Sequence, residues 1–159
     1  MIRRLVVTGL MVLAMAGQAA ALSCRAPDAQ RSFDAAAKSD GNFIVVHGRF
    51  AFDAGELPRG DNQSQQPPVA IPARFEGAGL TVEGFTTPLA MGVTLNVSCA
   101  GPWCGGIGAD IDYLAFLERR IGGYVLEIGP CPQWAFQTPS TQILDQMRTA
   151  IRGGDTQIR

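Results

Sequence analysis

The sequence has little positive charge, a single histidine and no Cys-x-x-Cys pair. Of its 13 basic residues, Arg3 and Arg4 precede the first apolar run, so 11 remain against 14 acidic residues in the rest of the chain. This weakly acidic balance argues against nucleic-acid binding, which needs a basic patch. The missing Cys-x-x-Cys argues against thiol redox catalysis. The Gly-rich stretch 105–108 lacks the Lys-Ser/Thr of a phosphate loop.

The first apolar run, Leu5–Ala16, is too short for a membrane span, which takes roughly 20 residues. It follows two arginines and leads to Ala19-x-Ala21, a pattern typical of a secretory signal peptide. We predict that residues 1–21 are a signal peptide and that the mature protein, from Leu22, is periplasmic or secreted without a transmembrane span. The alternative is a lipid anchor on Cys24, because the residues before it resemble a bacterial lipobox with two positions exchanged.

All four cysteines follow the signal peptide, which indicates an oxidising compartment and two disulfides. We favour Cys24–Cys131 with Cys99–Cys104, since the second bond closes a short loop between strands. Cys24–Cys99 with Cys104–Cys131 is the next choice. A four-cysteine zinc site is a weaker alternative, because such sites normally use paired Cys-x-x-Cys knuckles.

The rest of the chain predicts a single, mainly β domain over residues 22–159, with a helix near each end and a polar tail at 153–159. The first helix is expected within Pro27–Lys38 and the last, which is amphipathic, within Ser140–Arg152. Five or six strands lie between them, identified by β-branched and aromatic runs. They are expected at Phe43–Phe52, Val69–Glu76, Leu80–Phe85, Val93–Cys99, Tyr113–Leu117 and Tyr124–Ile128.

Four features shape this strand pattern. The last two strands form a hairpin whose turn contains Gly122-Gly123, and Gly77-Ala78-Gly79 is expected to form another turn. Gly48 is expected to mark a bulge or a sharp coil, as a barrel would need. The polar segment Asp53–Pro68 is expected to be an exposed loop, either functional or a simple insertion.

Candidates for chemistry are few. His47, the only histidine, lies on a predicted strand and is interpreted as a residue of a strand face. As a general base it would need an orienting carboxylate, such as Asp110 or Asp112, within hydrogen-bond reach. Those two aspartates resemble part of a calcium loop whose remainder is missing, and we expect them in a turn. We therefore predict no catalytic residues, no metal and no cofactor, and expect a protein that is not an enzyme.

Two tryptophans each lie within three residues of a cysteine, Trp103 beside Cys104 and Trp134 beside Cys131. Aromatic side chains in such positions usually cover the disulfide in a core or minor cluster. The alternative is that an exposed Trp103 anchors a partner, because Trp is enriched in interface hot spots.

The order of these elements resembles the netrin-like module shared by tissue inhibitors of metalloproteinases and small bacterial secreted proteins. The resemblance rests on an early Cys24, the strand with Val46-His47-Gly48, the strand ending at Cys99, the strand Tyr113–Leu117 and the strand running into Cys131. It implies a five-stranded OB-like Greek-key barrel with terminal helices and an N-terminal segment linked to the barrel by a disulfide.

The resemblance implies a non-catalytic binding module for a protein or small ligand in the envelope or extracellular space. Trp103, Trp134, His47 and the Asp53–Pro68 loop are the expected contact residues. Metalloproteinase inhibition is the first alternative, although the inhibitors begin with Cys-x-Cys and this chain has only Cys24 in that region. The second alternative is a small periplasmic enzyme that uses His47.

Overall fold

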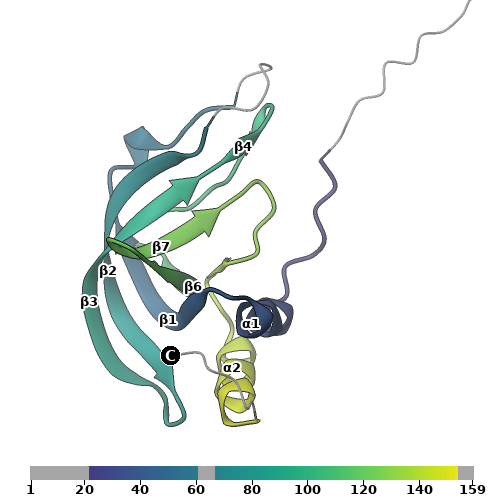
Figure 1. Ribbon diagram of the computed structural model, residues 1–159, viewed down its shortest axis with the longest axis vertical. Helices are drawn as coiled ribbons and strands as arrows, with labels where there is room; N and C mark the ends of the chain where they lie inside the picture. The colour runs from purple at the N-terminus through teal and green to yellow at the C-terminus, as the bar shows by residue number, and fades with distance from the viewer. Residues whose placement is uncertain (1–21, 61–66, 154–159) are drawn as a thin grey trace, which may run out of the picture.

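The computed structural model describes residues 22–60 and 67–153 (Figure 1). The expected signal peptide, the middle of the Asp53–Pro68 loop and most of the polar tail lie outside the described residues.

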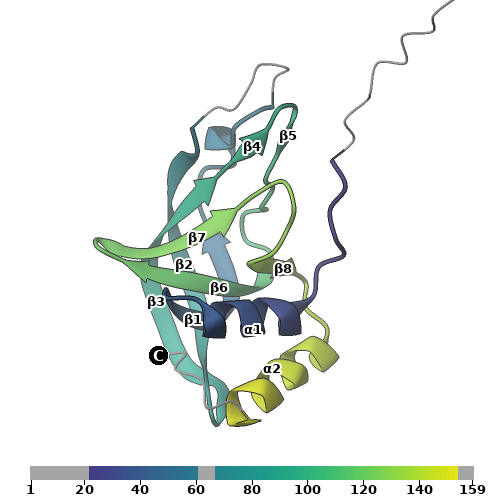
Figure 2. The same cartoon turned by 45° about the vertical axis from the view of Figure 1, so that its right-hand side comes forward.

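Five strands close into a barrel (Figures 1 and 2). They follow the order β1-β2-β3-β7-β6, and β6 pairs back with β1. Neighbouring strands are antiparallel except for β3 and β7, which are parallel. This arrangement is a five-stranded Greek-key barrel of the OB type, which confirms the predicted fold class. The strands are β1 (Asn42–Ala51), β2 (Val69–Thr81), β3 (Gly84–Val97), β6 (Asp112–Arg120) and β7 (Gly123–Ile128).

The remaining elements lie around the barrel. Both predicted helices are present, α1 (Ala29–Lys38) and α2 (Thr141–Gly153), and they lie on one side of the barrel in both views (Figures 1 and 2). A short strand, β8, pairs with β6 and extends the sheet to six strands. A two-stranded hairpin and one turn of 3-10 helix complete the described chain. These elements are β8 (Ala135–Gln137), β4 (Cys99–Ala100), β5 (Trp103–Cys104) and η1 (Ala54–Glu56).

The alternation of side chains along the strands produces two apolar clusters. On β1, Val46 and Phe50 point into the barrel and belong to the inner cluster, together with Phe75, Leu95 and Leu117. The other face of β1 and β6 belongs to the outer cluster, which the two helices cover. Its members include Phe33, Phe43, Val45, Leu114, Phe116, Phe136 and Met147. Each face of the β1–β6 sheet is therefore buried.

The predicted turn at Gly77-Ala78-Gly79 is wrong. Strand β2 runs through these residues without interruption, and the chain turns at Val82-Glu83 instead. Gly84, which has a φ of 105°, supplies the left-handed conformation at that turn. Glycine-rich composition suggested a turn, but Gly77 is needed for a close contact between strands.

Gly48 and Gly77 face each other across β1 and β2. A Cβ atom on Gly48 would lie 2.3 Å from the carbonyl oxygen of Glu76, and one on Gly77 would lie 2.2 Å from that of His47. The ring of Phe75 packs within 3 Å of both hypothetical Cβ positions. The register shift lies between Gly79 and Leu80 rather than at Gly48. Gly48 therefore serves a close approach of the β1 and β2 backbones.

The structure pairs Cys24 with Cys131 and Cys99 with Cys104, the first of the connectivities considered above. Four cysteines bonded in this way cannot form a zinc site. The Cys24 sulfur, bonded to Cys131, is also unavailable for a thioether-linked lipid. In the described part of the chain, no helix has the length and apolar character to cross a membrane. Two disulfides fit an extracytoplasmic protein.

Replacing Gly48 by Ala is expected to lower the free energy of unfolding by about 1–3 kcal/mol, because the new methyl group meets backbone atoms that cannot move independently. Gly92→Ala on β3 is the matched control. Its Cβ would have no neighbour within 4 Å, so a change within about 0.5 kcal/mol is expected. Urea unfolding of both variants measures the difference, and equal losses would contradict the close-approach argument.

Removal of the two disulfides is expected to have unequal effects. Cys24–Cys131 spans 107 residues of sequence and Cys99–Cys104 spans 5. In the chain-entropy model, losing the first lowers the free energy of unfolding by about 4–5 kcal/mol and losing the second by about 2 kcal/mol. Urea unfolding of the two double Cys→Ser variants tests this order. A larger loss of unfolding free energy on removing Cys99–Cys104 than on removing Cys24–Cys131 would contradict the prediction.

Candidate functional site

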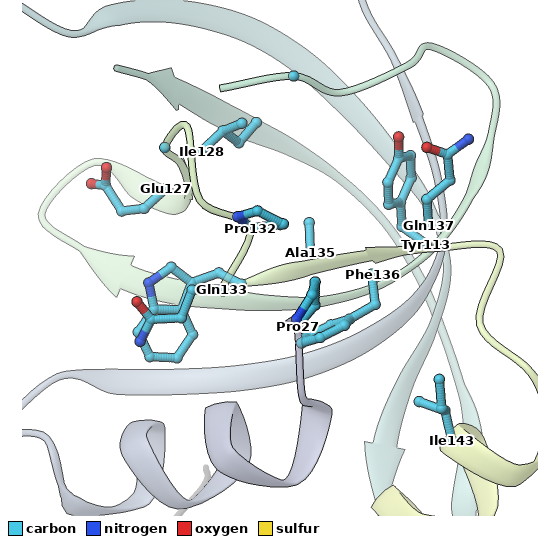
Figure 3. A pocket seen from close by; sticks show the side chains of 13 residues that line it. Pro27, Tyr113, Glu127, Ile128, Pro132, Gln133, Ala135, Phe136, Gln137 and Ile143 are labelled. Atoms are coloured by element: carbon cyan, nitrogen blue, oxygen red, sulfur yellow. The ribbon is translucent and has the colours of Figure 1, made fainter. Parts of the chain in front are cut away.

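An open cleft of about 460 Å³ lies between β7 and β8 (Figure 3). Its walls come from the end of β7, from β8, and from the loop between them. Four further residues complete it: Pro27 of the N-terminal segment, Gly106 of the loop before β6, Tyr113 of β6, and Ile143 of α2. The lining is chiefly apolar and aromatic with a few amides, which is typical of a binding site for an uncharged ligand. It contains Pro27, Gly106, Tyr113, Glu127, Ile128, Gly129, Pro132, Gln133, Trp134, Ala135, Phe136, Gln137 and Ile143.

The cleft exists because β7 separates from β6 after a short pairing. Glu118 faces Val125 in the hairpin, so continuation of that register would place Phe116 opposite Glu127. Instead, the Phe116 N–H donates to the carbonyl of Trp134 over 2.8 Å, and β8 takes the place of β7 beside β6. The wall of the barrel is therefore open between β7 and β8.

Glu127 is the one charged residue of the cleft lining, and its carboxylate is engaged. Asn96 Nδ2 donates to Glu127 Oε2 over 2.7 Å, and Arg120 Nη1 lies 2.7 Å from Glu127 Oε1. Desolvation lowers the pKa of Arg120, but hydrogen bonds to Glu118 and Glu127 and the charges of both carboxylates outweigh it. The pKa of Arg120 is therefore raised above its ordinary value. These contacts hold the Glu127 side chain toward the neighbouring strands.

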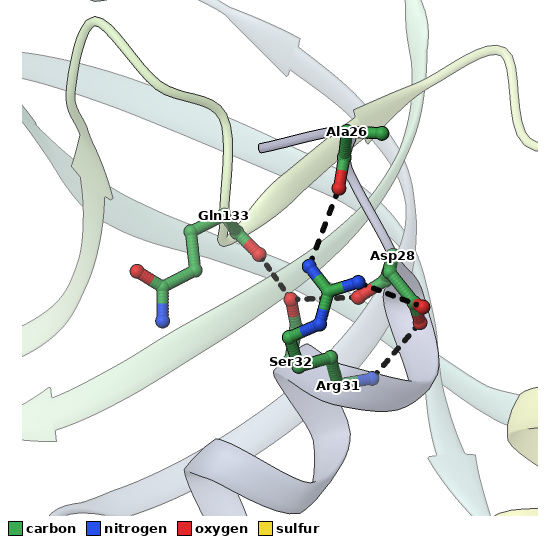
Figure 4. A network of polar contacts seen from close by, with 5 residues as sticks. All are labelled: Ala26, Asp28, Arg31, Ser32 and Gln133. Carbon is green, nitrogen blue, oxygen red and sulfur yellow. Dashed lines mark hydrogen bonds and ion pairs between the residues drawn. The ribbon is translucent and has the colours of Figure 1, made fainter. Parts of the chain in front are cut away.

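The loop between β7 and β8 is fixed at two points. The Cys24–Cys131 bond ties it to the N-terminal segment. At the start of α1, the buried Ser32 hydroxyl lies within hydrogen-bond distance of the carbonyls of Asp28 and Gln133 (Figure 4). Asp28 caps the same helix by accepting from the Arg31 N–H, also drawn in Figure 4. The loop wall of the cleft is therefore held by a covalent bond and a capped helix.

Trp134 is half-buried and is part of the cleft lining. Its ring stacks on Phe43 at a centroid distance of 5.0 Å and lies 6.0 Å from the ring of Phe116. These contacts place Trp134 between the two apolar clusters, both of which it touches. The indole of Trp134 therefore forms part of the cleft wall. One of its faces is covered by Phe43, so that face cannot contact a partner.

Trp103 lies elsewhere, on the β4–β5 hairpin, and is 43% exposed. The hairpin approaches the loop between β1 and β2, because a Cβ atom on Gly60 would lie 2.1 Å from the carbonyl oxygen of Pro102. Figure 2 shows the hairpin and the described first part of this loop at the same end of the barrel. The two predicted contact surfaces are thus adjacent, and Trp103 belongs to the surface rather than to a core.

His47 lies on the outer face of β1 next to the first residue of β6. Its Nε2 atom is 2.7 Å from Asp112 Oδ2, and its ring packs against the edge of Phe85 at 5.5 Å. The side chains of His47 and Asp112 are 26% and 41% exposed. Asp110 lies in the preceding turn, as expected, with a φ of 57°, whereas Asp112, which was expected in the same turn, is the first residue of β6. The structure therefore brings His47 to one of its two candidate carboxylates, outside the cleft.

No cluster of three or more His, Cys, Asp or Glu side chains suited to a metal occurs within residues 22–60 and 67–153. Sequence reasoning missed most of the cleft residues. Pro132, Ala135 and Gln137 carry no chemical signature, and β8 is too short for its alternation to be recognised. Trp134 is the one cleft residue that the sequence indicated, through its position beside Cys131.

Comparisons with protein-family models, with curated proteins and with solved structures find no match for this chain.

Proposed function

We propose that the protein is an exported, non-catalytic binding module that holds an uncharged or basic ligand in the cleft between β7 and β8. The observation that carries the proposal is the apolar lining of an opening in the barrel wall, in which the only carboxylate already has two partners. Such a lining offers contact area without a reactive group, which suits recognition better than reaction.

Export and the netrin-like type are parts of this proposal. The two disulfides support a periplasmic or secreted location. The barrel, the two helices and the N-terminal segment bonded to the barrel through Cys24 are what the netrin-like resemblance implies, and they support it. Metalloproteinase inhibition depends on that resemblance alone, and no contact of the cleft favours it.

The second candidate function is a small enzyme that uses His47 as a general base. The 2.7 Å contact between His47 and Asp112 favours it, because an aspartate that orients an imidazole is a common catalytic arrangement. Neither residue lines the cleft, and their exposure leaves the pair in contact with water. We rank this function second for those two reasons.

Small neutral probes should bind in the cleft. We expect N-isobutylacetamide, titrated against the uniformly 15N-labelled protein, to shift the amide signals of Gly106, Gly129 and Ala135. Ala135→Leu places a larger side chain in the cleft and should weaken these shifts. Ala90→Leu, an equal enlargement at an exposed position of β3, is the matched control and should preserve them. Shifts confined to the Trp103 hairpin would contradict the proposed site.

His47 should contribute little to either stability or binding. A double-mutant cycle with His47→Gln and Asp112→Asn, measured by urea unfolding, is expected to give a coupling energy below about 1 kcal/mol because the pair is partly exposed. The His47→Gln variant should bind N-isobutylacetamide like the parent. Hydrolysis of p-nitrophenyl acetate faster than by free imidazole at equal concentration, and lost in His47→Gln, would favour the enzyme instead.

A further inference from the structure

The outer edge of β8 presents backbone hydrogen-bonding groups to the cleft. Phe116 and Asp112 of β6 pair with Trp134 and Thr138, through bonds of 2.8 Å each. Pairs that exchange hydrogen bonds alternate along an antiparallel ladder, so even-numbered residues of this segment direct their N–H and C=O groups toward β6. The backbone groups of Ala135 and Gln137 therefore point to the opposite edge, which lines the cleft.

The facing edge of β7 presents similar groups. The carbonyl of Ile128 accepts from the Ser98 N–H over 2.9 Å and thus points away from the cleft, toward the end of β3. Successive residues of a strand alternate in this direction, so the N–H and C=O groups of Glu127 point into the cleft. In a continued hairpin these groups would form hydrogen bonds with Phe116, but the Phe116 N–H donates to the carbonyl of Trp134 instead. Within the described residues, no protein group replaces it.

The lining residues come from both faces of the barrel wall. Tyr113, Ile128 and Ala135 belong to the inner cluster or pack against it. Phe136 belongs to the outer cluster. A cleft that borders both faces is an opening through the wall, and Figure 3 shows Ala135 and Phe136 of the same short strand on different sides of the ribbon. An inserted β-strand has the matching property, because its side chains alternate between the two faces.

Charge complementarity narrows the choice of ligand. The cleft lining contains no Lys or Arg, and its single carboxylate is already held by Arg120 and Asn96. An acidic segment would find no cation there and would be repelled by Glu127. A neutral or basic segment meets an apolar wall on each of its two faces.

We infer that the occupant of the cleft is an extended segment of a partner polypeptide, which adds a strand between β7 and β8. This inference rests on the proposed binding function of the cleft and specifies its ligand. Main-chain hydrogen bonds to Glu127, Ala135 and Gln137 supply affinity in this mode of recognition, and the apolar walls select the side chains.

The test compares two peptides that differ only in backbone donors. The probe is the acetylated, amidated heptapeptide Lys-Thr-Val-Thr-Val-Thr-Lys, and the control carries N-methyl groups on its two Val residues, which face one edge of a strand. NMR titration of the 15N-labelled protein should locate the parent peptide at Ala135 and Gln137. The methylated peptide should bind about tenfold more weakly or worse, because two main-chain hydrogen bonds are lost. Equal affinities would overturn the inference.

A matched pair of protein variants gives a second measurement. Gln137→Pro removes the Gln137 N–H, which points into the cleft and does not pair with β6. Gln137→Ala retains this N–H. The Pro variant should bind the parent peptide about five- to tenfold more weakly than the Ala variant. If Gln137→Pro does not fold, the comparison of peptides still decides the question.

The outcomes separate this inference from the proposed function. If N-isobutylacetamide binds in the cleft while the two peptides bind equally, the cleft binds ligands without strand addition, and only the inference fails. If neither probe shifts the cleft amides, both proposals fail. Concentration-dependent dimerisation that protects the Ala135 and Gln137 amides from hydrogen exchange would identify a second copy of the chain as the occupant and would overturn the partner polypeptide.

Discussion

The hydrogen bond from the Phe116 N–H to the carbonyl of Trp134 determines the shape of the site. It ends the pairing of β6 with β7 after a few residues and lets β8 continue the sheet in its place. It also positions the Trp134 ring against Phe43. The closed barrel is preserved because β3 and β7 remain parallel neighbours on the other side. The replacement of β7 by β8 beside β6 therefore leaves a cleft in the barrel wall, while the ring of five paired strands stays closed.

Most of the fold could be predicted because its strands carry strong local signals. The segment Phe43–Phe52 is dense in β-branched and aromatic residues, and the hairpin around Gly122-Gly123 combines two apolar runs with a turn that needs positive φ. The error at Gly77 has a specific cause. Glycine serves turns and close backbone contacts equally well, and the partner that decides between them, Gly48, is distant in sequence.

The site was far less predictable. Four of its lining residues are prolines or glycines with no reactive group, and its main strand has only three residues. The contact of His47 with Asp112 joins positions 65 residues apart, and only strand register brings them together. Sequence could name His47 and its candidate carboxylates, but it could not choose between Asp110 and Asp112. Pairing between strands distant in sequence, rather than local propensity, forms both the cleft and the His47–Asp112 contact.

The two apolar clusters explain how the protein tolerates an opening in its wall. Strand β8 is held by β6 on one edge, by Phe136 in the outer cluster and by the Cys24–Cys131 bond in the preceding loop. Strand β7 is held by β3 and by Leu126 in the inner cluster. Neither strand needs the other for its position, so their facing edges can remain available to a ligand. A site built in this way is pre-formed, and binding requires little ordering of the protein itself.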